Sequence, residues 1–344
     1  MNTKIFEMSP EVIDASAIAE AAEILRSGGL VAFPTETVYG LGGNATDASA
    51  ATKIYAAKGR PSDNPLIVHI ASPEDADQYA ITNEVYDRLA KAFMPGPLTV
   101  ILPKKDTVPS TVTGGLDTVA LRCPSHPIAH ALIKAAGVGI AAPSANRSGS
   151  PSPSLGKHVI RDMDGRIEVI IDGGACEIGL ESTIISLDGN TATLLRPGAI
   201  TSDALLCVCD EVKIAPAVTE TLSENERPLS PGMKYRHYAP SAPLVLLDGD
   251  TDAVLSFLHR AQNAERCAIL CYTEEFDLLR NERLIDVGAR DDLVAQAHSL
   301  FAALRQADDL DCDIIYAHLP PKNGMGLALY NRLIRAAAHT VISV

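Results

Sequence analysis

The sequence predicts an α/β protein with two domains, and three observations support this prediction. Apolar residues make up 47% of the chain, whereas aromatic residues make up only 4% and Trp is absent. The cores must therefore be built from aliphatic side chains, which is typical of strands buried under helices in largely parallel sheets. Short aliphatic runs alternate with segments of helical spacing. The length of 344 residues suits two domains of ordinary size.

Residues 1–212 are predicted to form a strand-rich α/β domain with long, irregular loops. Short apolar runs bounded by Gly and Pro predict strands at 30–33, 66–70, 98–102, 119–122, 138–142, 168–174 and 182–187. Helical spacing of apolar residues predicts helices at 14–27, 47–57, 74–80, 83–92 and 125–136.

Residues 213–242 are polar, contain four prolines and lack apolar periodicity, so they are predicted to be a linker. Residues 243–344 then alternate between strand and helix, which predicts a smaller, Rossmann-like open parallel sheet. Thr251 is the expected N-cap of the first of these helices. The predicted strands are 243–248, 267–272, 283–288 and 313–319, and the predicted helices are 251–262, 289–310 and 324–339.

Composition and missing motifs exclude several classes of protein. The net charge is 29 − 43 = −14, which argues against broad nucleic-acid affinity because phosphate contacts need clustered Lys and Arg. No apolar run reaches 18 residues, and the N-terminus lacks the apolar segment of a secretory signal. Seven cysteines without metal-like spacing favour buried thiols in a reducing, cytoplasmic setting. The Walker A, GxSxG and HExxH motifs are absent. We assign no metal site.

Two loops of the first domain concentrate polar residues after short strands. Residues 33–45, FPTETVYGLGGNA, place two Thr hydroxyls around a Glu before a Gly-rich turn. In residues 53–70, the cations Lys58 and Arg60 follow a helix, and a guanidinium and an ammonium are suited to phosphate. For Lys58 and Arg60, a cation pair exposed to solvent at the end of a helix remains an open interpretation. For His69, which stands in an apolar strand, a histidine that is hydrogen-bonded in the core also remains open.

Two further loops carry groups that can contact a ligand. Arg122 ends an aliphatic strand, where a cation needs a partner because its burial alone is costly. That partner is either a substrate carboxylate or an acidic side chain of the protein. Residues 140–154, IAAPSANRSGSPSPS, combine small residues and hydroxyls that allow a close approach to phosphate, although a plain surface loop looks similar. Ser182 and Arg196 lie in two shorter segments, GLESTIISL and LLRPGAI.

Together these segments resemble the YrdC-like threonylcarbamoyl-AMP synthases. The resemblance rests on their order and spacing and covers about residues 9–205, while GMKYRHYAP and the C-terminal βα region resemble the long, two-domain form of that family. It implies a twisted mixed sheet with a concave groove, followed by the smaller open parallel sheet. The segments that carry it are PTETVYGLG, KGRPSDNPL, MPGPLTVIL, LRCPSHP, APSANRSG, ESTII and RPGAI.

The resemblance also implies an activity and a set of binding residues. Such enzymes condense L-threonine, bicarbonate and ATP, with Mg²⁺, into threonylcarbamoyl-adenylate and release pyrophosphate. A separate transferase complex then modifies tRNA, so tRNA would be only an indirect partner and no membrane is involved. No side chain is assigned as acid or base. By resemblance, L-threonine is bound by Thr37, His69, Arg122, Ala142 and Ser182, and ATP by Lys58, Arg60, Asn64, Thr118, Ser144, Ser152, Arg196 and Tyr235.

The linker motif KYRHY suggests a lid. It places Lys234, Arg236 and His237 beside two tyrosines, and such a segment could exclude water from an unstable carbamate. Two other functions remain open on the sequence alone. One is an RNA-binding module acting in ribosome or tRNA maturation without adenylate synthesis, and the other is a carbamoyl-adenylate activity that uses carbamoyl phosphate.

Overall fold

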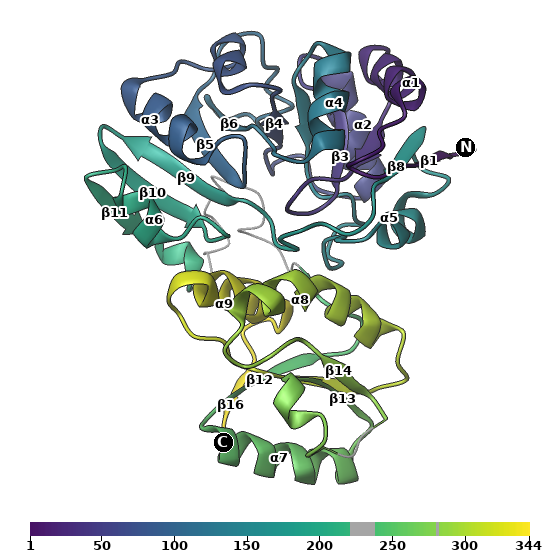
Figure 1. Cartoon of the computed structure of the whole chain (residues 1–344), viewed down its shortest axis with the longest axis vertical. Helices are drawn as coiled ribbons and strands as arrows, with labels where there is room; N and C mark the ends of the chain where they lie inside the picture. Colours follow the sequence, from purple (N-terminus) through teal and green to yellow (C-terminus); the bar gives the residue numbers. More distant parts are fainter. Residues whose placement is uncertain (221–237, 280–281) are drawn as a thin grey trace. The chain divides into compact units, whose positions relative to one another are not determined.

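The computed structural model of the chain describes residues 1–220, 238–279 and 282–344 (Figure 1). It divides into two compact units, each described here by itself. The first contains Met1–Ser148, Ser152–Glu177 and the chain from Glu181 onward, whereas the second contains Gly149–Pro151, Ile178–Leu180 and the C-terminal part ending at Val344. The change from the first to the second falls within 221–237, outside the described residues.

A large mixed sheet forms the first unit, as the resemblance implied. Its order is β1-β8-β2-β3-β7-β4-β6-β5-β9-β10-β11. The sheet contains both parallel pairs, such as β4 with β6, and antiparallel pairs, such as β4 with β7. Its strands are β1 (Lys4–Glu7), β2 (Val31–Phe33), β3 (Gly40–Asn44), β4 (Ile67–His69), β5 (Leu98–Pro103), β6 (Thr118–Arg122), β7 (Ile140–Ala142), β8 (Val169–Asp172), β9 (Thr183–Asp188), β10 (Thr191–Arg196) and β11 (Glu211–Ile214).

Helices cover this sheet, and a hydrophobic core of buried side chains lies under two of them. Apolar side chains of α1 and α4 pack together and against β2, β7 and β8, with Leu25 and Leu132 fully buried between them. Figure 1 shows these two helices side by side. The first unit contains α1 (Ala15–Arg26), α2 (Ala48–Lys58), α3 (Glu84–Phe93), α4 (Pro127–Ala136), α5 (Gly156–Met163), α6 (Ser202–Leu206) and the 3₁₀ helices η1 (Pro73–Gln78) and η2 (Pro216–Val218).

Several segments of the first unit differ from the sequence-based expectation, and β1, β10, α5 and α6 were not predicted. Residues 74–80 were expected to be a helix, but the structure has the 3₁₀ helix η1, which begins at Pro73. The Gly-rich segment after PTET continues into β3 instead of staying a turn. A Cβ on Gly42 would lie 2.6 Å from Ile140 Cγ2, so only glycine lets β3 pack this closely. The first residues of the predicted linker, Lys213 and Ile214, belong to β11, which pairs with β10.

An all-parallel sheet forms the second unit, in the order β14-β13-β15-β12-β16, and this confirms the predicted open parallel sheet. Helix α7 packs on one face, while α8 and α9 pack together on the other (Figure 1). The elements are β12 (Leu244–Asp248), α7 (Thr251–Ala264), β13 (Cys267–Cys271), η3 (Thr273–Glu275), β14 (Leu284–Asp286), α8 (Leu293–Asp308), β15 (Ile314–His318), α9 (Gly324–Ala336) and β16 (Val341–Ser343).

Two details of the second unit correct the sequence analysis. The N-cap of α7 is Asp250, whose side chain accepts a hydrogen bond from the backbone N–H of Ala253, so the expectation for Thr251 was wrong by one residue. The edge strand β16 was not predicted, because its three residues are too short and too exposed to give a clear pattern. The structure of all seven cysteines is described, and each is a free thiol.

Candidate active site

Three adjacent strands carry three of the predicted threonine-binding residues, and two of the three are paired. His69 ends β4 and Arg122 ends β6, and the two residues are direct partners in the parallel register of these strands. On the other side of β4, Ala142 ends β7 and lies opposite Ile67. The central part of the large sheet therefore places an imidazole and a guanidinium side by side at one strand edge.

The turn after β2 brings the PTET residues close to Arg122 at the end of β6. Thr35 Oγ1 accepts hydrogen bonds from the backbone N–H groups of Thr37 and Val38, each at 3.2 Å, and also donates to the carbonyl of Val38 at 2.6 Å. Such a side-chain turn fixes a tight loop by local hydrogen bonding. Thr37 is fully buried, and its hydroxyl lies 2.9 Å from that of Thr35. The turn thereby orients Glu36, the residue between the two threonines.

Glu36 is the protein partner of Arg122. Its Oε1 lies 2.8 Å from Arg122 Nη2, and both side chains are only 4% exposed. Arg122 Nη2 also contacts Thr35 Oγ1 at 3.4 Å. Of the two partners that the sequence left open for Arg122, the structure thus contains the acidic side chain. Within the described residues, however, neither oxygen of Glu36 has a hydrogen bond of good geometry, and Arg122 Nε has none either.

His69 is held as a neutral imidazole. Its Nδ1 faces the carbonyl oxygens of Ile67 at 3.1 Å and Ile140 at 3.3 Å, so this nitrogen must carry the proton. Burial, together with the charge of Arg122, lowers the pKa of His69 to about 3. Its Nε2 is therefore an acceptor. His69 is buried, as the core interpretation expected, and the charge of Arg122 acts on its ring.

Ser182 and Arg196, predicted to bind different substrates, contact each other directly. Arg196 donates from Nε to the carbonyl of Ser182 at 3.0 Å and from Nη2 to its hydroxyl at 3.1 Å. The same hydroxyl lies 2.7 Å from Thr99 Oγ1 on β5. This cluster is buried, so it fixes Ser182, the residue before β9, against β5. The two substrate subsites are expected to meet here.

On the side expected to bind ATP, Lys58 supports a loop. Lys58 ends α2, and its Nζ donates to the carbonyl oxygens of Ser144 and Asn146 and to the Asn146 side chain. The ammonium is only 5% exposed. We expected it to add to a phosphate-binding field; in the structure it fixes the backbone that presents Ser144, and its contact with phosphate stays a prediction.

The remaining predicted ATP residues lie in separate surroundings. Arg60 donates to the carbonyls of Asn64 and Pro65, and the fully buried amide of Asn64 has no hydrogen-bond partner within the described chain. Ser152 donates to Glu181 Oε1 at 2.6 Å. Thr118 begins β6 and is thus at the opposite end of that strand from Arg122. Tyr235 and the rest of KYRHY up to residue 237 lie outside the described residues.

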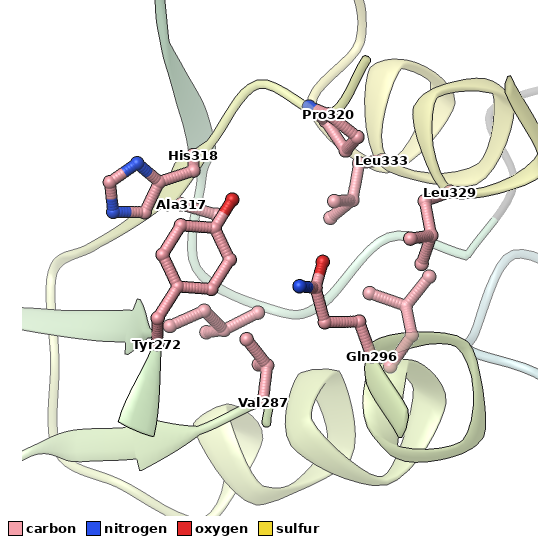
Figure 2. Close-up of a pocket in the computed structure, with 10 residues that line it drawn as sticks. Tyr272, Val287, Gln296, Ala317, His318, Pro320, Leu329 and Leu333 are labelled. Carbon is pink, nitrogen blue, oxygen red and sulfur yellow. The ribbon is translucent and has the colours of Figure 1, made fainter. Parts of the chain in front are cut away.

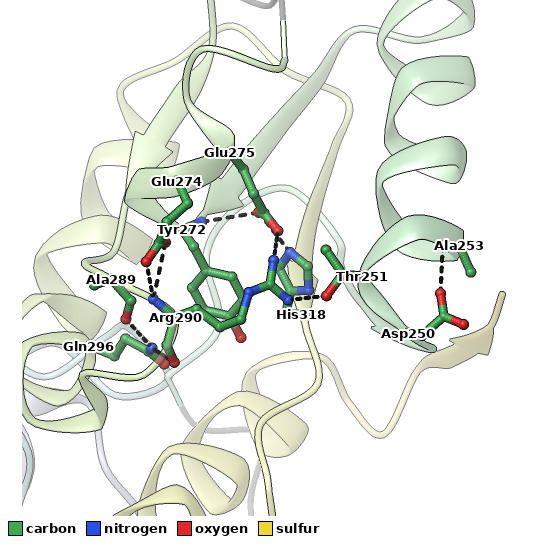
Figure 3. A network of polar contacts seen from close by, with 10 residues as sticks. All are labelled: Asp250, Thr251, Ala253, Tyr272, Glu274, Glu275, Ala289, Arg290, Gln296 and His318. Carbon is green, nitrogen blue, oxygen red and sulfur yellow. Dashed lines mark hydrogen bonds and ion pairs between the residues drawn. The ribbon is translucent and has the colours of Figure 1, made fainter.

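The second unit has its own polar cluster where its parallel strands end (Figure 3). Glu275, only 1% exposed, accepts a hydrogen bond from Arg290 Nη2 at 2.6 Å, and its other oxygen faces His318 Nε2 at 2.9 Å. The backbone N–H of Tyr272 donates to the latter oxygen at 3.2 Å. Burial raises the pKa of Glu275, but the hydrogen bond and charge of His318 and the charge of Arg290 outweigh it and hold that pKa below its ordinary value.

A small apolar pocket adjoins this cluster (Figure 2). The ring of Tyr272 stacks on His318 with centroids 4.4 Å apart, and Gln296 Nε2 donates to the carbonyls of Ala289 and Arg290. Open parallel sheets usually bind ligands outside the carboxyl ends of their strands. Here the charged groups at that edge bind one another, so we assign no ligand to it.

Within residues 1–220, 238–279 and 282–344, no cluster of three or more His, Cys, Asp or Glu side chains could hold a metal ion. In the same part of the chain, no helix has the length and apolar character needed to cross a bilayer.

The sequence analysis missed several residues of the first site. Glu36, Thr35, Thr99 and Asn146 were not selected, although the first two stand inside the quoted PTET motif. Their hydrogen bonds join segments that are distant in sequence, such as β5 and the start of β9. Only the fold could reveal these pairs.

Together, the fold and the site at the ends of β4 and β6 define a class of α/β enzyme. In this class, a YrdC-like mixed sheet precedes a small parallel sheet. Comparisons with known proteins agree. The family described as "Telomere recombination" matches residues 23–198, and the one described as "Threonylcarbamoyl-AMP synthase, C-terminal domain" matches residues 200–338.

Relatives cover nearly the whole chain. Threonylcarbamoyl-AMP synthase of Bacillus subtilis is 46% identical, over 94% of both chains, and that of Pyrococcus abyssi is 45% identical, over 97% of this chain and 98% of the relative. The crystal structure of P. abyssi Sua5 complexed with L-threonine has a TM-score of 0.92 at 43% identity and covers 99% of this chain and 100% of its own. The chain belongs to the threonylcarbamoyl-AMP synthase family, and this favours adenylate synthesis over a module that only binds RNA.

Proposed function

We propose that this protein synthesises threonylcarbamoyl-AMP from L-threonine, bicarbonate and ATP and releases pyrophosphate. It would thus be a nucleotidyltransferase. The observation that carries the proposal is the strand edge at which His69 and Arg122 lie side by side, with Ala142 on the adjacent strand β7, in a chain related over nearly its full length to synthases of this name.

Threonine is proposed to bind at this edge. Arg122 offers two donors to the substrate carboxylate, since its Nε has no partner of its own within the described chain. His69 Nε2, Thr37 and Ser182 are the hydroxyl-recognising candidates, and the small Ala142 leaves room for the methyl group. A site that pairs with the substrate hydroxyl discriminates strongly against amino acids lacking it, because its buried polar groups would otherwise stay unpaired.

ATP is proposed to bind beside it. The amide of Asn64 lacks a partner in the described structure, and positive charge is supplied by Arg60 at Asn64 and by Arg196 at Ser182. The carbamate formed on threonine would attack the α-phosphorus in line while charge develops on the pyrophosphate, which these guanidinium groups stabilise. Mg²⁺ would arrive with ATP and neutralise phosphate charge. The other proposed ATP contacts are Ser144, presented by Lys58, and Thr118, Ser152 and Tyr235.

The product is an activated acyl-adenylate, so it must be consumed by a group transfer. We propose that a separate transferase complex moves the threonylcarbamoyl group to tRNA and that this chain meets tRNA only indirectly, in the cytoplasm. The net charge of −14 agrees with the absence of a broad RNA-binding role.

Pyrophosphate release from the purified protein tests the proposal. The reaction would contain ATP, Mg²⁺ and bicarbonate, with L-threonine, with L-serine or with no amino acid. We expect release that depends on L-threonine and is weaker with L-serine, which lacks the methyl group. Equal release without an amino acid, or release only with carbamoyl phosphate, would refute the proposal.

A further inference from the structure

Glu36 is a buried carboxylate whose hydrogen bonding is incomplete. It is 3% exposed, and its one charged contact is the 2.8 Å pair with Arg122 among the described residues. Neither of its oxygens has a hydrogen-bond partner there. A buried carboxylate in this condition is costly, because desolvation is not repaid by donors. The free oxygens therefore point to a donor that a ligand supplies.

The charges around Glu36 identify the donor. The titratable groups whose charge acts on it are Arg122 and His126 and the thiols Cys123 and Cys176. Burial raises the pKa of each thiol to about 12 and lowers that of His126. At neutral pH the thiols and the imidazole are thus uncharged, and the site presents one cation next to one anion.

A free α-amino acid carries the complementary pair of charges. If its carboxylate binds Arg122 through Nε, which has no partner within the described residues, its ammonium can lie against Glu36, and the four charges then alternate in sign. Arg122 and Glu36 lie on β6 and on the turn after β2, and the fixed ion pair sets their spacing. His69 suits the ammonium less well, because it is next to the Arg122 cation that also lowers its pKa.

We propose that Glu36 is the residue that binds the α-ammonium of the amino-acid substrate and accepts its proton, so that the amine can form a carbamate. This inference rests on the proposed function. The ammonium N–H bond breaks, its electron pair stays on nitrogen, and the proton passes to the Glu36 carboxylate. The free amine then attacks bicarbonate, which forms a C–N bond and releases water, and Glu36 returns its proton to solvent after each turnover.

The variant Glu36→Gln tests this role, since it keeps the shape and removes the charge and the basicity. Binding is measured by thermal shift with L-threonine and with (R)-3-hydroxybutyrate, which has the same carboxylate and hydroxyl but no amine. We expect the wild type to bind threonine more tightly than (R)-3-hydroxybutyrate. In the variant, the ratio of the two affinities should fall by at least about tenfold. Protection by ATP should stay unchanged. Equal preference in both proteins would overturn the inference.

The pH dependence of threonine-dependent pyrophosphate release gives a second readout that a purely structural role would not change. In Glu36→Gln the amine must deprotonate in solution, so its rate should rise about tenfold per pH unit below the pKa of the amine. The wild-type rate should rise less steeply. An active variant with a wild-type pH profile would overturn the proton-acceptor role and leave the proposed function intact.

Two further variants keep the experiment decisive. Glu36→Asp retains the charge on a shorter side chain and should keep the wild-type pH profile at a lower rate; a steep profile would count against the proposal. Glu275→Gln makes the same change at a buried Glu–Arg pair of the second unit and should keep the full preference for threonine. If the wild type releases no pyrophosphate but Glu36 still governs that preference, the proposed function fails and the recognition role stands.

Discussion

Each unit of this protein contains a buried Glu paired with an Arg, and the two pairs differ in how completely they are hydrogen-bonded. Glu275 faces three donors, from Arg290, His318 and the backbone of Tyr272, at 2.6–3.2 Å (Figure 3). Glu36 has its charged contact with Arg122 at 2.8 Å, but no hydrogen bond of good geometry within the described residues.

We infer that the difference separates a structural ion pair, at Glu275, from one that binds substrate, at Glu36. Buried charges that are fully hydrogen-bonded repay their desolvation within the protein, whereas an incompletely bonded pair retains the capacity to bind. The Glu275 cluster also lies at the strand edge where parallel sheets usually bind ligands, so position alone does not distinguish the two pairs. Hydrogen-bond completeness does distinguish them.

The largest difference between the pairs is expected when the arginines are replaced. Arg122→Met should reduce threonine-dependent pyrophosphate release by several hundredfold or more, because a lost buried charge partner costs about 3–5 kcal/mol. Arg290→Met should leave the rate within about twofold. Steady-state rates at saturating ATP measure both. Similar losses in the two variants would mean that the Arg290 cluster also serves the reaction.

Stability should show the opposite ranking for the glutamates. Glu275→Gln places an amide NH₂ against donors, so we expect it to cost about 2–4 kcal/mol of unfolding free energy. Glu36→Gln removes the charged contact with Arg122 but no hydrogen bond, so its cost should be smaller by about 1–2 kcal/mol. Urea unfolding, with hydrogen exchange to assign the loss to 243–344, measures both. A larger cost at Glu36 would contradict the distinction.

The histidine beside Arg122 should make the stability of the first unit depend on pH. The folded pKa of His69 is lowered to about 3, so the unfolded chain binds more protons between pH 6.5 and 3. Its contribution is therefore complete above pH 6.5 and is lost as the pH falls, by up to about 1.4 kcal/mol per pH unit. Denaturant midpoints of the wild type and His69→Gln, compared from pH 7 to pH 4, should converge as the pH falls. Parallel curves would show that His69 is not held neutral.

The sequence predicted much of the fold because local patterns specify it. Aliphatic strands and amphipathic helices of the second unit repeat clearly, and β12, β13, β14 and β15 all lie where the runs indicated. The strand β3 was missed because its sequence GLGGN reads as a turn, although close packing against Ile140 requires those glycines. In the same way, the three-residue β16 has no pattern of its own.

For the site, the sequence and the resemblance supplied the residue types but not their partners. Arg122 was selected with two open alternatives, because its pairing with Glu36 spans 86 residues and depends on the register of the sheet. Lys58 was assigned to phosphate, yet its ammonium is occupied by the loop at 144–146. Contacts between distant segments, and the burial that makes them costly or stable, arise only in the folded chain.

The smallest effect should come from the hydroxyl pair that joins β5 to the start of β9. Thr99→Val keeps the shape but removes the 2.7 Å hydrogen bond to Ser182, and should cost about 1 kcal/mol because the bond is buried. Thr273→Val in the second unit removes an exposed bond of 2.9 Å to Asp286 and should cost less. Thermal unfolding compares the two. Because the Ser182 hydroxyl also accepts from Arg196, only Thr99→Val should weaken threonine binding, and equal binding in both variants would place Ser182 outside the threonine site.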